Sequence, residues 1–113
     1  TVAVGVIPPG HVSPMHLHEI DEEVVYVLQG ELTAILDGEE YTVGPGGTVF
    51  IPPGTWMALE NRTETSVFSL GVLSRGELEE CFRVLFSRDA DEAARRDALG
   101  LCRLKMRAPT PSD

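Results

Sequence analysis

The chain has 113 residues, and its 18 Asp and Glu outnumber 9 Lys and Arg for a formal net charge of −9. This length predicts one domain, and the negative charge argues against nucleic acid and anionic membranes as partners. The sequence shows no apolar run of the ~20 residues that span a bilayer, no secretory leader pattern, and too few cysteines for a disulfide framework. We therefore expect a cytoplasmic, soluble protein in which Cys81 and Cys102 are free thiols.

The first two-thirds of the chain predicts an all-β unit. Short runs rich in Val, Ile, Thr and Tyr alternate with Gly and Pro breaks. Asp37-Gly38 is the strongest hairpin signal among these breaks. The predicted strands cover residues 2–7, 15–18, 23–29, 31–36, 39–43, 48–51, 56–61 and 65–73. Eight short strands with tight turns favour a β-sandwich or a barrel.

The last third changes to a helical composition. Leu78, Phe82 and Leu85 have helical spacing, which predicts a helix over residues 77–86. Asp89, followed three residues later by Glu92, resembles a capping box and predicts a second helix over residues 90–99.

Gly100 is the expected end of that second helix. Residues 101–106 alternate between apolar and polar side chains, as expected of a final strand. We thus expect a β unit over 1–75, a helical extension over 76–108 and a disordered tail over 109–113.

One region carries residues suited to chemistry. His16 and His18 are two apart, so on a strand their imidazoles project from the same face. A carboxylate follows within five residues. Two His and one carboxylate with open positions is the ligand set of non-haem Fe(II) oxygenases, and it also suits Mn, Co, Ni or Zn. Because Glu is a hard ligand, the set disfavours a purely soft Cu(I) site.

The same region resembles a known family. The run Gly10-x5-His16-x-His18-x4-Glu23-x6-Gly30 is similar to the first motif of the cupin superfamily. Gly46-x5-Pro52-x-Gly54-x2-Met57-x3-Asn61 resembles the second motif. Together the motifs span residues 10–61, and the extension is similar to that of small single-domain cupins of the quercetin-dioxygenase-like group.

The resemblance implies a double-stranded β-helix, or jelly-roll barrel, with a metal in its mouth. His16, His18 and Glu23 would be ligands of one divalent transition metal, iron first. Family spacing allows Glu22 or Glu23, and we favour Glu23 because it keeps the six-residue gap to Gly30. Adjacent strand residues face opposite sides, so one of the two enters the barrel.

Met57 stands where the family has a fourth ligand, a His. Its thioether is a weak acceptor without charge. Three interpretations stay open: three ligands hold the metal and leave a position for water, substrate or O2; the barrel is a metal-free pocket; or Met57 is an axial ligand to copper.

An apolar pocket is expected around this site, because small-molecule sites are concave and mostly apolar. Its predicted lining is Met57, Val25, Val27, Trp56 and Leu59. Such a pocket favours an organic substrate with an apolar body and a chelating oxygen.

We also expect a homodimer. The chain begins at the strand before the first motif, which would leave a barrel edge open to strand exchange or sheet extension. The function expected is therefore a metal-dependent enzyme, with a dioxygenase as the leading activity and Glu23 as a possible catalytic base. The alternatives are a metal-dependent cyclase, isomerase or lyase, and a metal-free module that binds a small ligand.

Overall fold

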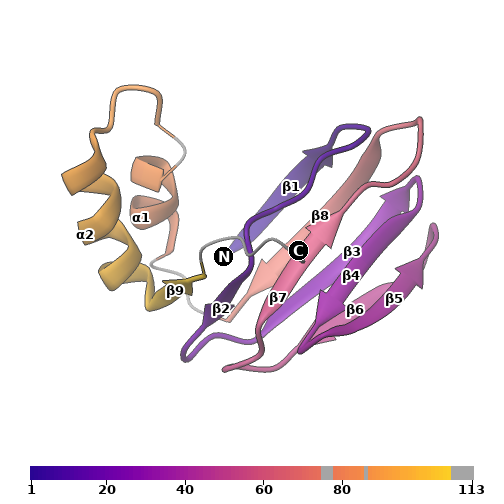
Figure 1. The fold of residues 1–113 in the computed structure, drawn as a ribbon, viewed down its shortest axis with the longest axis horizontal. Helices are drawn as coiled ribbons and strands as arrows, with labels where there is room; N and C mark the ends of the chain where they lie inside the picture. The colour runs from indigo at the N-terminus through magenta and orange to yellow at the C-terminus, as the bar shows by residue number, and fades with distance from the viewer. Residues whose placement is uncertain (75–77, 86, 108–113) are drawn as a thin grey trace.

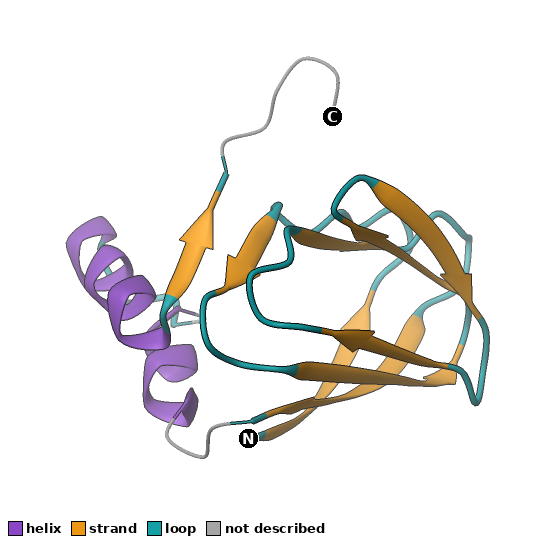
Figure 2. Ribbon diagram, turned by 90° about the horizontal axis from the view of Figure 1, so that it is seen from below, coloured by secondary structure: helices purple, strands orange, loops and turns teal. Residues whose placement is uncertain are grey.

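The computed structural model describes residues 1–74, 78–85 and 87–107, which form two antiparallel sheets with two helices beside them (Figure 1). The first sheet has the strand order β1-β8-β3-β6 and the second has the order β5-β4-β7-β2-β9. Figure 2 shows the sheets as two layers, with the helices at one end. This all-β architecture confirms the predicted double-stranded β-helix.

The eight strands expected before the helices are present, with bounds that shift by one or two residues. They are β1 (Val2–Ile7), β2 (His16–His18), β3 (Glu23–Gln29), β4 (Leu32–Leu36), β5 (Glu39–Val43), β6 (Thr48–Ile51), β7 (Met57–Glu60) and β8 (Val67–Leu73). Asp37 and Gly38 both have positive φ, 48° and 85°, as a tight β4–β5 hairpin turn requires.

The main core fills the space between the two sheets. Strand alternation brings one set of side chains from each sheet into a single apolar cluster. Its buried members are Val25, Val27, Leu32, Ala34, Val49, Ile51, Met57 and Val67. The sandwich is therefore held together by the odd-numbered residues of β3, β6 and β8 and by the facing residues of β4 and β7.

The helices differ in detail from the prediction. Helix α1 spans Leu78–Leu85, and α2 spans Glu92–Cys102. The N-cap of α2 is Asp91, not Asp89, and its carboxylate accepts a 2.7 Å hydrogen bond from the Ala94 amide. Asp91 acts as the N-cap because it lies three residues before Ala94, the spacing at which a capping side chain reaches a backbone amide of the first turn.

Gly100 does not end α2, which continues to Cys102. The helix terminates at Arg103, whose left-handed conformation (φ 57°, ψ 44°) lets its amide reach the carbonyls of Leu99 and Gly100. The final strand is consequently shorter than predicted, and β9 spans Leu104–Met106. The expected tail over 109–113 and the expected boundary at 75–76 lie outside the described residues.

Cys81 and Cys102 form a disulfide, with 5.9 Å between their Cα atoms, so the prediction of free thiols is wrong. The assignment of Cys102 to the last strand is also wrong, because it closes α2. Both cysteines belong to a second small core, with Leu73 and Ala98, that packs α1 against α2. The two cysteines are 21 residues apart in the sequence, and the packing of α1 against α2 brings them together.

Strand β9 ties the helices to the second sheet. It pairs with β2 in antiparallel register, with Met106 opposite His16 and Leu104 opposite His18. The extension is thus hydrogen-bonded to the strand that carries both predicted His ligands. Neither described helix is long and apolar enough to cross a membrane.

Candidate metal centre and its apolar cavity

A cavity of about 530 Å³ opens between the two sheets and the helices. It is lined by inward residues of β1, β8, β3, β2 and β7 and by residues of the helical extension. The lining consists of Ala3, Gly5, Ile7, His11, Ser13, Pro14, His16, His18, Glu23, Val25, Leu59, Ser69, Gly71, Leu73, Phe82, Leu85, Leu99, Leu104 and Met106. The cavity is mostly apolar, with its titratable groups gathered from the region of the first motif.

His16 and His18 both face this cavity from β2. Their ring centroids are 5.3 Å apart and the rings are nearly perpendicular, at 72°. His16 Nδ1 donates a 2.9 Å hydrogen bond to the Pro14 carbonyl, which leaves Nε2 directed away from the backbone. Burial lowers the pKa of His16, although the Pro14 bond opposes this in part. The ring therefore favours the neutral form that ligates metals.

Glu23 reaches the same cavity from β3. Its side chain is 14% exposed, and Oε2 lies 3.6 Å from His18 Nε2. That oxygen is buried and accepts no hydrogen bond from the described residues. Burial raises the pKa of Glu23 to about 7. Glu22, the other candidate carboxylate, is exposed and does not line the cavity.

The donor set suits a divalent metal in chemical type, and its three residues line the same cavity. Two imidazoles and a buried carboxylate oxygen lacking a donor share one cavity. Across residues 1–74, 78–85 and 87–107, however, no three His, Cys, Asp or Glu side chains are already drawn together closely enough to hold an ion. Binding would therefore require these donors to come closer to one another.

The predicted pocket residues separate into two groups. Val25 and Leu59 line the cavity. Met57 and Val27 belong to the main core instead, and Met57 is 1% exposed. Met57 nevertheless lies directly opposite His16 in the β2–β7 register. Trp56 precedes β7, where its amide bonds to Asp37, and it is not among the lining residues.

Several lining residues escaped the sequence argument. Phe82, Leu85 and Leu99 come from the helices, and Leu104 and Met106 come from β9. The apolar face of residues 77–86 was a visible signal, but nothing in the sequence said which surface it covers. His11, in the loop before β2, is exposed and also borders the cavity.

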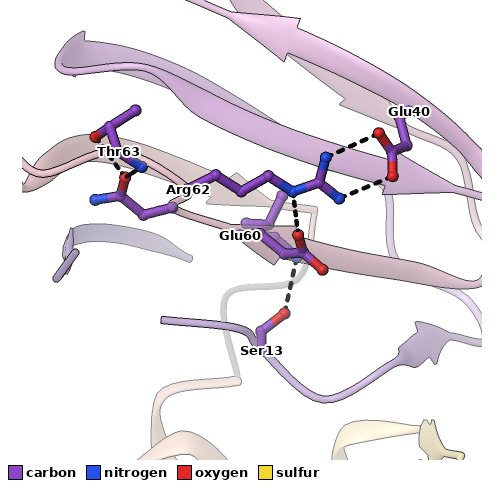
Figure 3. A network of polar contacts seen from close by, with 7 residues as sticks. Ser13, Glu40, Glu60, Arg62 and Thr63 are labelled. Atoms are coloured by element: carbon purple, nitrogen blue, oxygen red, sulfur yellow. Dashed lines mark hydrogen bonds and ion pairs between the residues drawn. The ribbon is translucent and has the colours of Figure 1, made fainter. Parts of the chain in front are cut away.

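Polar contacts hold β7, the strand that pairs with the histidine-bearing β2. Ser13 Oγ accepts a 2.8 Å hydrogen bond from the Leu59 amide, which anchors the first-motif loop to β7 (Figure 3). Beyond β7, Arg62 bridges Glu60 and Glu40 at 2.7 and 2.8 Å. Buried Asn61 donates to the Ile7 and Thr65 carbonyls, which gives this second-motif residue a structural role.

Comparison with known proteins places this site in context. The model of the family described as "Cupin domain" matches residues 3–72. An uncharacterized protein of Methanocaldococcus jannaschii is 36% identical over 61 residues, which are 54% of this chain and 49% of that protein. The chain thus spans about half the length of the curated relative it matches.

Solved structures share the fold. A predicted oxalate decarboxylase from Thermotoga maritima is 29% identical with a TM-score of 0.61, over 64% of this chain and 63% of that one. A sugar phosphate isomerase of the cupin superfamily from Silicibacter pomeroyi is 30% identical with a TM-score of 0.61, over 66% of this chain and 49% of that one.

Proposed function

The chain belongs to the cupin family, and from that premise we propose that it is a metal-dependent enzyme acting on a small, largely apolar organic molecule, with a non-haem-iron-type dioxygenase as the leading activity. The observation that carries this proposal is the convergence of His16, His18 and Glu23 on one mostly apolar cavity. We assign the substrate an apolar body and an oxygen that chelates the metal.

His16, His18 and Glu23 would hold the metal, with iron as the first candidate and Mn, Ni, Zn or Cu as the others. When bound, such a metal would supply Lewis acidity and, as iron, redox chemistry towards O2. The apolar walls would exclude water and orient the substrate body. In the metal-free protein the raised pKa of Glu23 lets its carboxyl hold or release a proton near neutral pH.

The composition of the cavity argues against two substrates suggested by the solved relatives. Within the described residues its lining contains no Lys or Arg, the side chains that bind phosphate. A sugar phosphate would therefore enter without a cationic partner. Oxalate is a small dianion and would leave most of an apolar 530 Å³ cavity unfilled.

Metal content tests the proposal. The chain is purified without chelator or affinity metal, reconstituted anaerobically with Fe(II), and assayed for metal by elemental analysis. We expect close to one ion per chain. His16→Ala, His18→Ala and Glu23→Gln should each lose it, whereas Glu22→Gln is the matched control and should keep it. Unchanged metal content in both His variants would refute the site.

A second candidate function is a metal-free module that binds a small ligand. The favouring observation is Met57, which stands where the resemblance implies a fourth His ligand, combined with the separation of the three donors among the described residues. Absence of metal even after anaerobic reconstitution would support this candidate. The search would then turn to apolar ligands of the cavity.

A further inference from the structure

The disulfide lies next to the wall of the apolar cavity. Cys81 directly precedes Phe82, and Cys102 stands two residues before Leu104; both of these apolar residues line the cavity. Leu85, about one helical turn beyond Cys81, lines it as well. The bond therefore joins two segments that each supply part of the wall around the candidate metal centre.

These two segments are held to the β unit in different ways. The end of α2 is anchored to the second sheet, because the Arg103 carbonyl accepts a 2.8 Å hydrogen bond from the Glu19 amide and β9 pairs with β2. Helix α1 lies beside α2 (Figure 1) and packs against it through the small core. Cys81 and Cys102 are two of the four buried members of that core. Opening the bond should therefore loosen α1 more than α2.

A second groove gives access to one of the two cysteines. It has a volume of about 230 Å³, lies between α1 and α2, and has Cys81 and Ala98 in its lining. Cys102 does not line this groove among the described residues, and its exposed fraction is 0%, against 5% for Cys81. Thiol–disulfide exchange requires a thiolate to reach a sulfur atom directly. A small thiol should therefore attack Cys81 rather than Cys102.

We propose that the Cys81–Cys102 disulfide is a site of thiol–disulfide exchange that controls the cavity, because its reduction releases α1 and opens the wall formed by Phe82 and Leu85. The inference rests on the proposed function in one respect, that the apolar cavity is the ligand site, and it is independent of the metal. The oxidised chain keeps the wall closed and binds an apolar ligand tightly. The reduced chain populates an open wall and binds the same ligand weakly.

A dithiol supplies the electrons for this exchange. One of its thiolates attacks Cys81 Sγ, forms a mixed disulfide and breaks the bond to Cys102, whose sulfur leaves with the electron pair and takes up a proton. The second thiolate of the reductant then displaces Cys81, which is protonated in turn. Two electrons and two protons pass to the protein, and the dithiol becomes a cyclic disulfide.

Fluorescence titration of the metal-free chain with N-phenyl-1-naphthylamine, a neutral apolar probe, tests the control of the cavity. The affinity is measured before and after reduction with dithiothreitol, and mass spectrometry verifies the gain of two hydrogen atoms. We expect reduction to raise the dissociation constant at least about tenfold, because the probe loses contact with Phe82 and Leu85. The double variant Cys81→Ala/Cys102→Ala should bind as weakly as the reduced chain. Because it has no disulfide, it also controls for any other effect of dithiothreitol.

Circular dichroism of the same samples separates release of α1 from loss of the fold. The β signal should survive reduction, because the disulfide lies outside the main core. Loss of that signal would overturn the proposal, as would equal dissociation constants for the oxidised and reduced parent chain. An oxidised chain that binds no probe would overturn it too, and the metal content of that preparation would then test the proposed function separately.

A brief reaction with cysteamine, a monothiol, locates the point of attack. The reaction is quenched with acid, and peptide mapping by mass spectrometry finds the mixed disulfide. We expect at least about ten times more adduct on Cys81 than on Cys102, because access decides which sulfur is attacked. An adduct mainly on Cys102 would overturn the groove between α1 and α2 as the route of the reductant.

Discussion

Glu23 is the residue whose environment most alters its chemistry. Its carboxyl is buried beside His18, and desolvation raises its pKa from 4.5 to about 7. Metal binding needs the carboxylate, so the affinity for metal should rise with pH up to about 7. If Glu23 holds a metal as proposed, its buried oxygen would link metal binding, proton binding and stability at one position.

The stability of the metal-free chain should depend on pH through Glu23. Below pH 4.5 the carboxyl is protonated in both the folded and the unfolded state, and its burial has no ionic cost. Between 4.5 and about 7 the folded state retains a proton that the unfolded state releases, so the free energy of unfolding falls as pH rises. The loss is on the order of 3 kcal/mol and is complete above pH 7.

Urea unfolding at several pH values measures this dependence. Glu23→Gln should remove the loss of stability between pH 4.5 and 7 relative to the parent. Glu22→Gln, a change of the exposed neighbour, should retain it. Identical pH profiles for the parent and Glu23→Gln would show that Glu23 is not desolvated.

Met57 is the second informative residue. It is buried in the main core, yet it lies opposite His16 in the β2–β7 register, where side chains of paired residues are ~5 Å apart. We predict that Met57→His tightens metal binding by completing a four-ligand set. Isothermal titration with Fe(II) or Mn(II) measures the affinity, and an unchanged value would mean that position 57 does not reach the metal.

Among the elements, the helical extension is the one that shapes the cavity. Leu85 and Leu99 from the helices complete a wall that the two sheets leave open. This wall lies outside the residues that match the family model, which end at 72. Part of the cavity wall therefore comes from residues beyond the region that the family model matches.

A series of alkyl hydroxamates tests the role of that wall. The hydroxamate head chelates metal, so affinity in the Fe(II)-loaded chain should rise about fourfold per added CH2 as the alkyl tail fills the apolar cavity. Leu85→Ala should flatten the rise for long tails. Leu101→Ala, on α2 with a 73% exposed side chain, is the matched control. An equal gain in affinity per CH2 in the parent, Leu85→Ala and Leu101→Ala would show that the helices do not line the binding pocket.

The disulfide should stabilise the extension. Cys81 and Cys102 are separated by 21 residues, and closing a loop of that length is worth about 3 kcal/mol in the chain-entropy account. We predict that Cys81→Ser lowers the free energy of unfolding of the helices by about that amount. Hydrogen exchange of α1 and α2 with and without reductant measures it. Unchanged hydrogen exchange after reduction would show that the small core stabilises α1 and α2 without the disulfide.

At the scale of the whole molecule, two cores of different size hold the chain. The main core joins both sheets, and the small core joins α1 to α2. The β2–β9 pairing connects the small unit to the large one, and the disulfide joins α1 to α2 within the small unit. Truncation of a main-core side chain should therefore lower the stability of the entire fold. Truncation of a small-core side chain should first lower the stability of the helices.

A substitution at Leu32 tests this division between the two cores, because Leu32 is fully buried between the sheets. Leu32→Ala should lower the global free energy of unfolding by about 2–5 kcal/mol, since the cavity left behind collapses only partly. Thermal and urea unfolding measure the change. Leu101→Ala changes an exposed Leu in the same way and should have little effect. A comparable loss in both variants would contradict the assigned core.

Much of the fold could be read from local signals. Alternating apolar residues, Gly and Pro breaks and the Asp37-Gly38 turn act over a few residues, so the strands of the β unit were predictable to within one or two positions. His16 and His18 on one strand face were predictable for the same reason. Helix ends were less predictable, because Asp89 and Asp91 both offer a capping carboxylate and the structure uses Asp91.

The sequence by itself determined the order of the elements, the family motifs and the residue types that could bind a metal. Tertiary structure decided which surfaces meet. It placed Met57 in the core and Leu85 in the cavity wall, joined Cys81 to Cys102, and left Val4 and Phe50 of the first sheet exposed. The reason is physical: periodicity shows that a side is apolar, but the partner of that side depends on contacts between residues far apart in the chain.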